Sequence, residues 1–96
     1  TYTPNEFSLA QNYPNPFNPT TEISFTMDKA SEVNLTIYNM LGQQVKVLTN
    51  MLLNAGTHNF TWDGRDQLGN SVSTGVYLYT LTGGEQTITK KMALMK

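Results

Sequence analysis

The 96-residue chain contains no cysteine, which excludes disulfides and thiolate metal sites. Charged residues make up only 14% of it, against about a quarter in an average domain, and the formal net charge is −1. A nucleic-acid binder needs a basic surplus to contact phosphates, so we expect no nucleic-acid partner. No apolar run approaches the roughly 18 residues that a membrane-spanning helix requires, so we expect no membrane span.

Uncharged polar residues are abundant instead, since 14 Thr and 10 Asn make up a quarter of the chain. One Trp, five Tyr and four Phe, together with many aliphatic residues, are sufficient for a core, which argues against disorder. A chain of this length is expected to form one domain.

Apolar and polar residues alternate with a period of two after Thr21, which predicts β-strands. The predicted strands cover 22–27, 33–38, 44–53, 57–62, 76–82 and 85–95, and a short pairing segment over 7–11 precedes them. The alternation is blurred over 48–53, where a bulge near Thr49–Asn50 or a helix over 48–54 would fit. Six or seven short strands separated by Gly and Asn turns predict an all-β antiparallel sandwich.

The N-terminal stretch has a different composition, because it contains every proline: Pro4, Pro14, Pro16 and Pro19. Proline lacks the N–H that a central strand requires, so this stretch is predicted to be coil and turn. It also carries apolar side chains, namely Phe7, Leu9, Tyr13 and Phe17. We therefore expect residues 1–6 to be a linker from an upstream domain and residues 7–96 to form the domain. Residues 7–20, here called the arm, are expected to pack on the rest of this domain.

Groups suited to catalysis are few. His58 is the only imidazole, and it shares a strand face with Phe60 and Trp62, which is typical of the edge of a core. Serines and aspartates are present, but no nucleophile elbow is, and the seven acids are scattered along the chain. We expect no enzyme activity and assign no catalytic residue.

The segment 63–70 is rich in oxygen ligands and raises the question of calcium, which binds six to eight oxygens. Its spacing is not that of an EF-hand, and no glutamate stands at the closing position. Asp63 and Asp66 are better interpreted as Asx turns, with Gly64 and Gly69 supplying positive φ. A structural calcium near the two aspartates is the less favoured alternative, and no other metal or cofactor is expected.

Trp62, Tyr77 and Tyr79 have two interpretations. Exposed on a sheet face, they would bind carbohydrate; buried, they would form the core, and a domain this small needs its one Trp inside. We favour packing. Tyr77 follows Gly75 at the start of a strand, where it would also suit a tyrosine corner.

Basic residues are concentrated at the end of the chain, where Lys90, Lys91 and Lys96 account for three of the six. They either protect an edge strand against aggregation or present a basic strand to another protein. Composition does not choose between these interpretations.

A series of motifs resembles a known family. They are Leu-Ala-Gln-Asn-Tyr-Pro-Asn-Pro-Phe-Asn-Pro-Thr-Thr (9–21), Ile-Tyr-Asn-Met-Leu-Gly-Gln (37–43), Ala-Gly-Thr-His (55–58), Trp-Asp-Gly (62–64), Gly-Val-Tyr-Leu-Tyr (75–79) and Lys-Lys-Met-Ala-Leu-Met-Lys (90–96). In this order they resemble the C-terminal sorting domains of the bacterial type IX secretion system (Por secretion type A). The middle part, with Trp62, Asp63, Gly64, Asp66 and Gly69, also resembles the Ig-like domain of flagellar hook-capping proteins.

The resemblance implies a seven-stranded Ig-like sandwich without catalytic activity. Such domains direct a cargo protein, attached upstream, through the periplasm and across the outer membrane of a Gram-negative bacterium. The partners implied are the type IX translocon and a sortase-like peptidase, which commonly removes the domain as the cargo is released or anchored at the cell surface.

The family's motif positions carry over residue by residue. Lys90, Lys91, Gly75 and Tyr77 become candidates for translocon recognition. The structural motif positions are Pro14, Asn15, Pro16, Trp62, Asp63, Gly64, Asp66 and Gly69. The alternative function is a structural or carbohydrate-binding Ig-like module of an extracellular multidomain enzyme.

Overall fold

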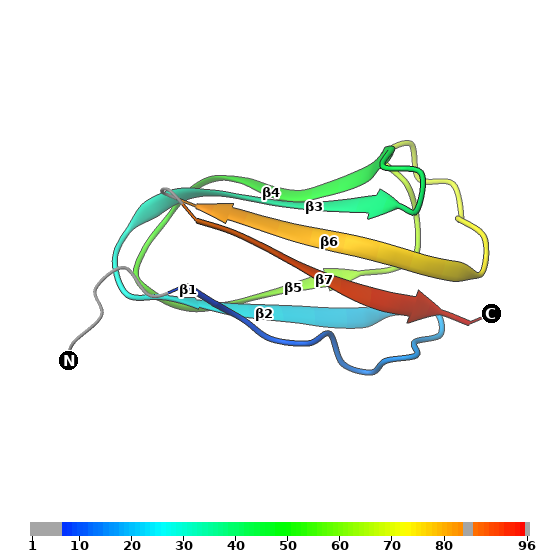
Figure 1. The fold of residues 1–96 in the computed structure, drawn as a ribbon, viewed down its shortest axis with the longest axis horizontal. Coiled ribbons are helices and arrows are strands. Elements are labelled where there is room, and N and C mark those ends of the chain that lie inside the picture. The colour runs from blue at the N-terminus through cyan, green and yellow to red at the C-terminus, as the bar shows by residue number, and fades with distance from the viewer. Residues whose placement is uncertain (1–6, 84–85, 96) are drawn as a thin grey trace.

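Two antiparallel sheets face each other in the molecule (Figure 1). The computed structural model describes residues 7–83 and 86–95. The three-stranded sheet has the order β1-β2-β5, and the four-stranded sheet has the order β4-β3-β6-β7. The strands are β1 (Phe7–Leu9), β2 (Thr21–Met27), β3 (Ser31–Asn39), β4 (Gln44–Leu53), β5 (Gly56–Trp62), β6 (Gly75–Gly83) and β7 (Gln86–Leu94). The predicted all-β, Ig-like antiparallel sandwich of about seven strands is confirmed.

Three sequence expectations fall partly or wholly outside the described residues. The predicted linker (1–6) and Lys96 lie outside them, as does the first residue of the predicted strand 85–95. Within the described residues, no helix is long and apolar enough to cross a bilayer.

The core lies between the sheets and follows the period-two pattern of the sequence. In β2, Ile23, Phe25 and Met27 are buried while Glu22 and Thr26 are exposed. The other strands contribute in the same way, and the buried apolar residues are Leu9, Phe17, Ile23, Phe25, Met27, Val33, Leu35, Ile37, Val45, Trp62, Tyr77, Tyr79, Leu81, Met92 and Leu94. Each large apolar side chain removed from water stabilises the fold by about 1.5–3 kcal/mol.

β4 departs from the simple pattern because it is bulged. Its register on β3 shifts between Leu35↔Thr49 and Thr36↔Val47, which leaves Leu48 as an extra residue. The bulge predicted near Thr49–Asn50 is thus present, one residue earlier. A helix over 48–54 is wrong, because this stretch continues the antiparallel ladder as far as the Ser31↔Leu53 pair.

The arm connects the two sheets. After β1, which ends two residues earlier than predicted, Tyr13 exchanges two backbone hydrogen bonds with Glu22 of β2, at 3.0 and 2.9 Å. The chain then crosses to the other sheet, where the Phe17 N–H donates to the Ala93 carbonyl at 3.0 Å and the Met95 N–H donates to the Phe17 carbonyl at 2.9 Å. The arm therefore packs on the domain, as predicted, and runs along part of β7.

A buried polar network fixes the arm. The Tyr79 hydroxyl donates to the Ala10 carbonyl at 2.9 Å and accepts the Asn12 N–H at 2.8 Å. The Asn12 side-chain amide donates to the Thr21 hydroxyl at 2.9 Å and to the Pro14 carbonyl at 3.1 Å. Burial raises the pKa of Tyr79 above its usual value, although the Asn12 N–H bond acts to lower it. The network satisfies polar groups that would otherwise be buried without partners.

Candidate interaction site around β7

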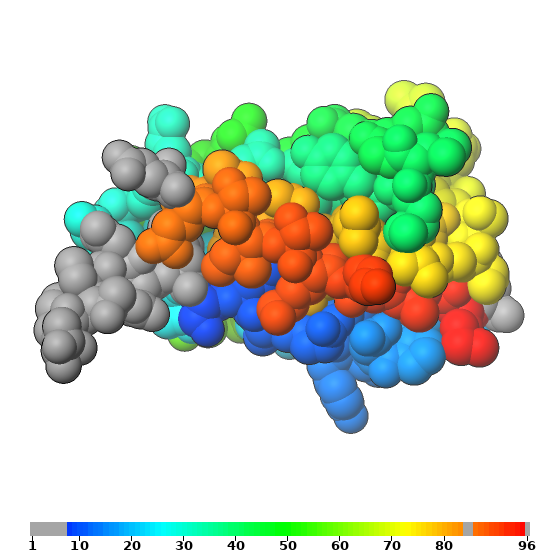
Figure 2. Space-filling model, in the orientation of Figure 1, coloured from blue at the N-terminus to red at the C-terminus, as the bar shows by residue number. Residues whose placement is uncertain are grey.

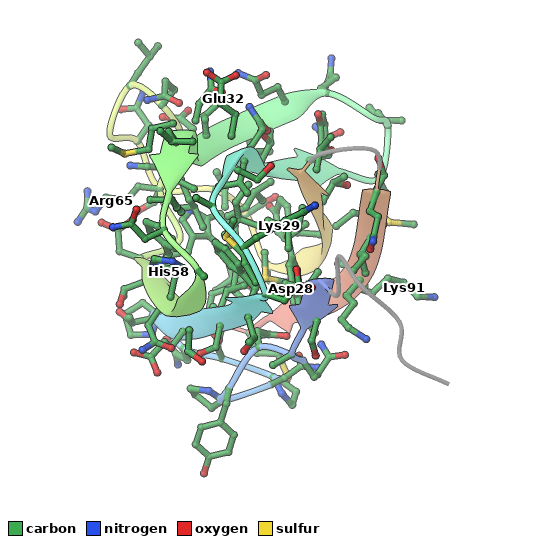
Figure 3. All side chains as sticks on the ribbon, turned by 90° about the vertical axis from the view of Figure 1, so that its left-hand side faces the viewer. Asp28, Lys29, Glu32, His58, Arg65 and Lys91 are labelled. Carbon is green, nitrogen blue, oxygen red and sulfur yellow. The ribbon has the colours of Figure 1, made fainter. Side chains whose placement is uncertain are left out.

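β7 is an edge strand of the four-stranded sheet: among the described strands it pairs with β6 alone, and the arm bonds to its C-terminal part. In Figure 2 its side chains form the orange-to-red band across the viewed face, bordered below by the blue arm. The inward-facing Met92 and Leu94 are buried, while Lys90 is half-buried and Lys91 is exposed. Figure 3 shows the Lys91 side chain pointing away from the sandwich. Because strand side chains alternate, the two adjacent lysines lie on opposite faces.

Two motifs that are far apart in the sequence, in the arm (9–21) and at the start of β6 (75–79), meet the C-terminal half of β7. Asn15 accepts the Ala93 N–H on its side-chain oxygen at 3.0 Å, and Phe17 bridges Leu94. On the other side of the strand, Gly75 pairs with Leu94 and Tyr77 pairs with Met92. The structure thus brings the arm and the start of β6 together at β7, next to the two lysines.

Trp62 anchors the loop that follows β5. Its side chain is fully buried, and its indole N–H donates to the Arg65 carbonyl at 2.9 Å. Its ring contacts Phe17 at a centroid distance of 5.5 Å and meets Tyr77 edge-on at 5.4 Å. The indole therefore holds the arm, β6 and the 63–74 loop against one another.

The two aspartates of the 63–74 loop form the predicted Asx turns. Asp63 accepts the Arg65 N–H on its carboxylate at 3.2 Å, and Asp66 accepts the N–H groups of Leu68 and Asn70 at 3.0 and 2.9 Å. Within residues 7–83 and 86–95, no three His, Cys, Asp or Glu side chains gather as metal ligands. The Asx-turn interpretation of both aspartates is confirmed.

Gly64 occupies a position that strongly favours glycine. Its φ of +75° lies in the left-handed region, and a Cβ there would lie 3.2 Å from the Pro19 carbonyl oxygen. Leu94 is also near, with its methyl groups 3.8 and 3.9 Å from that Cβ position. Gly69 has a similar φ of +89° but open space around it. Gly64 thus permits close contact between the loop and the arm.

This contrast predicts different costs for two matched substitutions. Gly69→Ala should cost about 1–2 kcal/mol, since it adds only left-handed strain. Gly64→Ala should destabilise more, because the same strain is joined by the clash with the Pro19 carbonyl. Urea denaturation of the two variants measures the difference. Equal losses of unfolding free energy would show that the close approach of residue 64 to the Pro19 carbonyl does not affect stability.

Tyr77 and Tyr79 are core residues. Tyr77 is 5% exposed, whereas Tyr79 and Trp62 are both 0% exposed. The Tyr77 hydroxyl donates to the Ser73 carbonyl four residues upstream at 2.6 Å, which is the contact of a tyrosine corner. Packing is confirmed for all three aromatics, and carbohydrate binding through them is wrong because their rings are not accessible.

His58 occupies the edge of the core, as its strand face predicted. It is half-buried, its ring lies 5.6 Å from that of Phe25, and its Nε2 is 2.7 Å from the Asn54 carbonyl oxygen. His58 lies on β5 and is labelled in Figure 3. Both the ring and one nitrogen are thus engaged in structural contacts.

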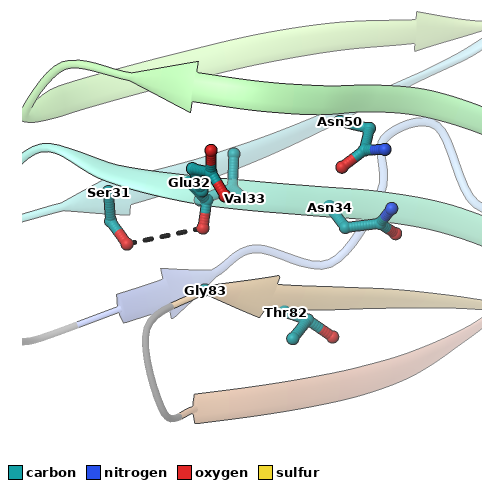
Figure 4. Close-up of a pocket in the computed structure, with 7 residues that line it drawn as sticks. All are labelled: Ser31, Glu32, Val33, Asn34, Asn50, Thr82 and Gly83. Atoms are coloured by element: carbon teal, nitrogen blue, oxygen red, sulfur yellow. Dashed lines mark hydrogen bonds between the residues drawn. The ribbon is translucent and has the colours of Figure 1, made fainter.

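A pocket lies at the opposite end of the four-stranded sheet from the Trp62 loop (Figure 4). Its lining is mostly hydroxyl and amide groups, with one carboxylate: Ser31, Glu32, Val33, Asn34, Asn50, Thr82 and Gly83. The Ser31 hydroxyl donates to the Glu32 carbonyl at 3.4 Å. Among the described lining residues Glu32 is the one titratable side chain, so these residues do not supply the second group that acid–base chemistry requires.

Comparison with known proteins identifies the family. A family model for the FlgD Ig-like domain matches residues 11–87. The chain belongs to the FlgD Ig-like domain family. The basal-body rod modification protein FlgD of Salmonella typhimurium is 36% identical over 66 residues, which cover 66% of this chain and 28% of FlgD. The FlgD Ig-like assignment agrees with the predicted relation to flagellar hook-capping proteins.

Two solved structures from Porphyromonas gingivalis share the fold of this FlgD Ig-like chain. Dimeric latent PorU matches with a TM-score of 0.74 and 18% identity, over 98% of this chain and 10% of PorU. PorZ, described as an essential bacterial surface component of the type IX secretion system, matches with a TM-score of 0.59 and 20% identity, over 90% of this chain and 11% of PorZ. At these identities the likeness concerns the fold.

The recognition role of Lys90, Lys91, Gly75 and Tyr77 stays a prediction. Sequence reasoning missed the polar network of Asn12, Thr21 and Tyr79. It also missed Gln11, whose side-chain amide donates to the Lys91 carbonyl at 2.7 Å. No periodic signal marks Gln11 and Asn12, because the arm has no regular secondary structure beyond β1, and the strand pattern around Thr21 and Tyr79 does not show that the arm supplies their hydrogen-bond partners.

Proposed function

We propose that this chain is a non-catalytic sorting module, which directs an attached cargo protein across the outer membrane by type IX secretion. The observation that carries the proposal is the convergence of the arm motif (9–21) and the β6 motif (75–79) on β7, where the two adjacent lysines also lie. The similarity to PorZ, a surface component of a type IX system, supports it. The partners are then the translocon, a sortase-like peptidase and an upstream cargo domain, and the cargo ends secreted or at the cell surface.

The proposal gives different roles to the four recognition candidates. Lys91 projects from the outer face of β7 and is available for a direct contact, while Lys90 is half-buried on the opposite face of the strand. Tyr77 is buried and Gly75 is half-buried, and both pair with the C-terminal half of β7. Their part is to hold β7 in register for recognition.

The double substitution Lys90→Ala/Lys91→Ala should reduce export of a reporter carrying this chain at its C-terminus, because it removes the basic groups of the recognition strand. Export is measured as the surface and medium fraction of the reporter in a Gram-negative bacterium with a type IX system. The domain should stay folded, since the double substitution removes no buried apolar side chain.

The matched control is Lys29→Ala/Lys46→Ala, which makes the same charge change away from β7. Lys29 lies between β2 and β3, and Lys46 lies on β4, the other edge strand of the sheet. This control should be exported like the parent. Equal export of both double variants and the parent would contradict a recognition role for the β7 lysines.

A second candidate function is that of a structural assembly module in a larger protein. The 36% identity to FlgD favours it, as does the extent of the family match, which ends at residue 87 and so omits Lys90 and Lys91. An assembly module would leave the fused reporter in the periplasm whether or not the lysines are present. A sorting module would export the fused reporter when the lysines are present.

A further inference from the structure

Within the part of the chain that the structure describes, the outer edge of β7 is bonded over only part of its length. The β6–β7 ladder runs without a register shift from Gly75↔Leu94 to Gly83↔Gln86. In such a ladder, alternate residues direct both backbone groups away from the partner strand. Ala93 is one of these residues, since its N–H and carbonyl bond to Asn15 and Phe17 of the arm. The backbone N–H and carbonyl groups of residues 87, 89 and 91 must therefore also point away from β6.

Thr89 gives independent evidence for this alternation of outward-pointing backbone groups. Its hydroxyl lies 3.0 Å from the hydroxyl of Thr80, the residue directly opposite on β6. Side chains come this close at the pairs that exchange no backbone hydrogen bonds across the ladder. The Thr89 N–H and carbonyl therefore point to the open side of β7.

The arm, including Gln11, covers the C-terminal part of this edge. Gln11 caps the Lys91 carbonyl, and the arm binds Ala93 and Met95. Among the described residues, no hydrogen bond joins the arm to the outward backbone groups of Thr87 and Thr89 or to the Lys91 N–H. Unpaired donors and acceptors in a row form a template for one more strand.

The two lysines specify the charge of such a strand. Lys90 and Lys91 lie at the C-terminal end of the open segment, on opposite faces of the sheet, and neither forms an ion pair with another described residue. On a strand paired with β7, two consecutive side chains would likewise lie on opposite faces. Two consecutive acidic residues would therefore place one carboxylate beside each lysine.

We propose that the 87–91 edge of β7 accepts an extended acidic segment of the translocon as a fifth strand of the sheet. The segment carries two consecutive acidic residues opposite Lys90 and Lys91, and the arm limits it to this half of the edge. This inference rests on the proposed function and names the chemistry of its partner.

Titration of this chain with two short strand-forming peptides tests the chemistry directly. One peptide has the sequence Thr-Val-Thr-Glu-Glu-Val-Thr-Val, and its counterpart carries Gln-Gln in place of Glu-Glu. Amide NMR shifts should concentrate at residues 87, 89 and 91. The Gln-Gln peptide should bind about tenfold more weakly, the factor that two exposed ion pairs supply together. Shifts centred on β4 or on the loops, or equal binding of both peptides, would overturn the proposal.

Thr89→Pro tests the backbone pairing itself. Proline removes an N–H that faces away from β6, which edge strands tolerate, and its ring blocks an added strand. The matched control is Thr89→Ala, which loses the same hydroxyl contact but keeps the N–H. Thr89→Ala should bind the Glu-Glu peptide like the parent, whereas Thr89→Pro should not bind it. Circular dichroism verifies that both variants are folded, and equal binding by a folded Thr89→Pro would overturn the proposal.

Export of the fused reporter separates this inference from the proposed function. If the parent chain does not direct export, the proposed function fails. If the parent and Thr89→Pro direct export equally, the strand-addition inference fails while the sorting function stands. The expected result is export by the parent and by Thr89→Ala, with export by Thr89→Pro lost, because the main-chain hydrogen bonds of an added strand supply its affinity.

Discussion

Replacing Trp62 with alanine should lower the free energy of unfolding by about 3–5 kcal/mol, the range for truncating a buried tryptophan. The side chain is fully buried and packs against the rings of Phe17 and Tyr77. Its loss leaves a cavity where the arm, β6 and the loop after β5 meet. A small domain has about 5–15 kcal/mol of stability, so the variant should be close to unfolding. Urea denaturation measures the change.

Two further variants identify the source of that loss. Trp62→Phe keeps an aromatic ring but removes the indole N–H, so the Arg65 carbonyl loses its donor, at a cost of about 1–3 kcal/mol. Leu68→Ala truncates an 86% exposed side chain on the same loop and should change stability by less than about 0.5 kcal/mol. If Trp62→Ala were as mild as Leu68→Ala, the indole would not anchor this end of the sandwich.

Removing residues 1–18 should lower the melting temperature by more than about 10 °C. Phe17 alone is 1% exposed, and losing such a ring costs about 3–5 kcal/mol; each kcal/mol shifts the melting temperature of a domain this size by roughly 4–8 °C. The truncation also leaves the buried Tyr79 hydroxyl without Asn12 and Ala10, and it uncovers the β7 edge at Ala93.

The control for this truncation lacks only residues 1–6, so the difference between the two reports the contribution of the arm. Pro14 and Pro16 lie where the arm crosses between the sheets, and the Pro14 carbonyl accepts hydrogen bonds from Asn12 and Thr21. An unchanged melting temperature on removing 1–18 would contradict the idea that this segment braces the sandwich. Thermal unfolding followed by circular dichroism gives the answer.

The strands and the core could be predicted from the sequence because they depend on a local rule. Side chains such as Ile23, Phe25 and Met27 alternate with polar neighbours, and that alternation holds whatever the strand pairs with. The Asx turns of Asp63 and Asp66 were predictable for the same reason, since each aspartate bonds backbone groups two to four residues away.

The sheet order and the arm network could not be predicted, because they depend on contacts between distant residues. Nothing local relates Phe17 to Leu94 or Gln11 to Lys91. Asn12 and Thr21 are polar, so their types predict exposure, yet they are 2% and 1% exposed because other parts of the fold satisfy their hydrogen bonds. Which half of β7 stays open follows from these distant contacts.

The most direct test of the sorting function is the location of a periplasmic reporter fused in front of this chain, compared in cells with an intact type IX translocon and in cells lacking it. The sorting proposal predicts reporter at the cell surface or in the medium only when the translocon is present. Reporter retained in the periplasm of both strains, with the fused domain folded, would contradict it.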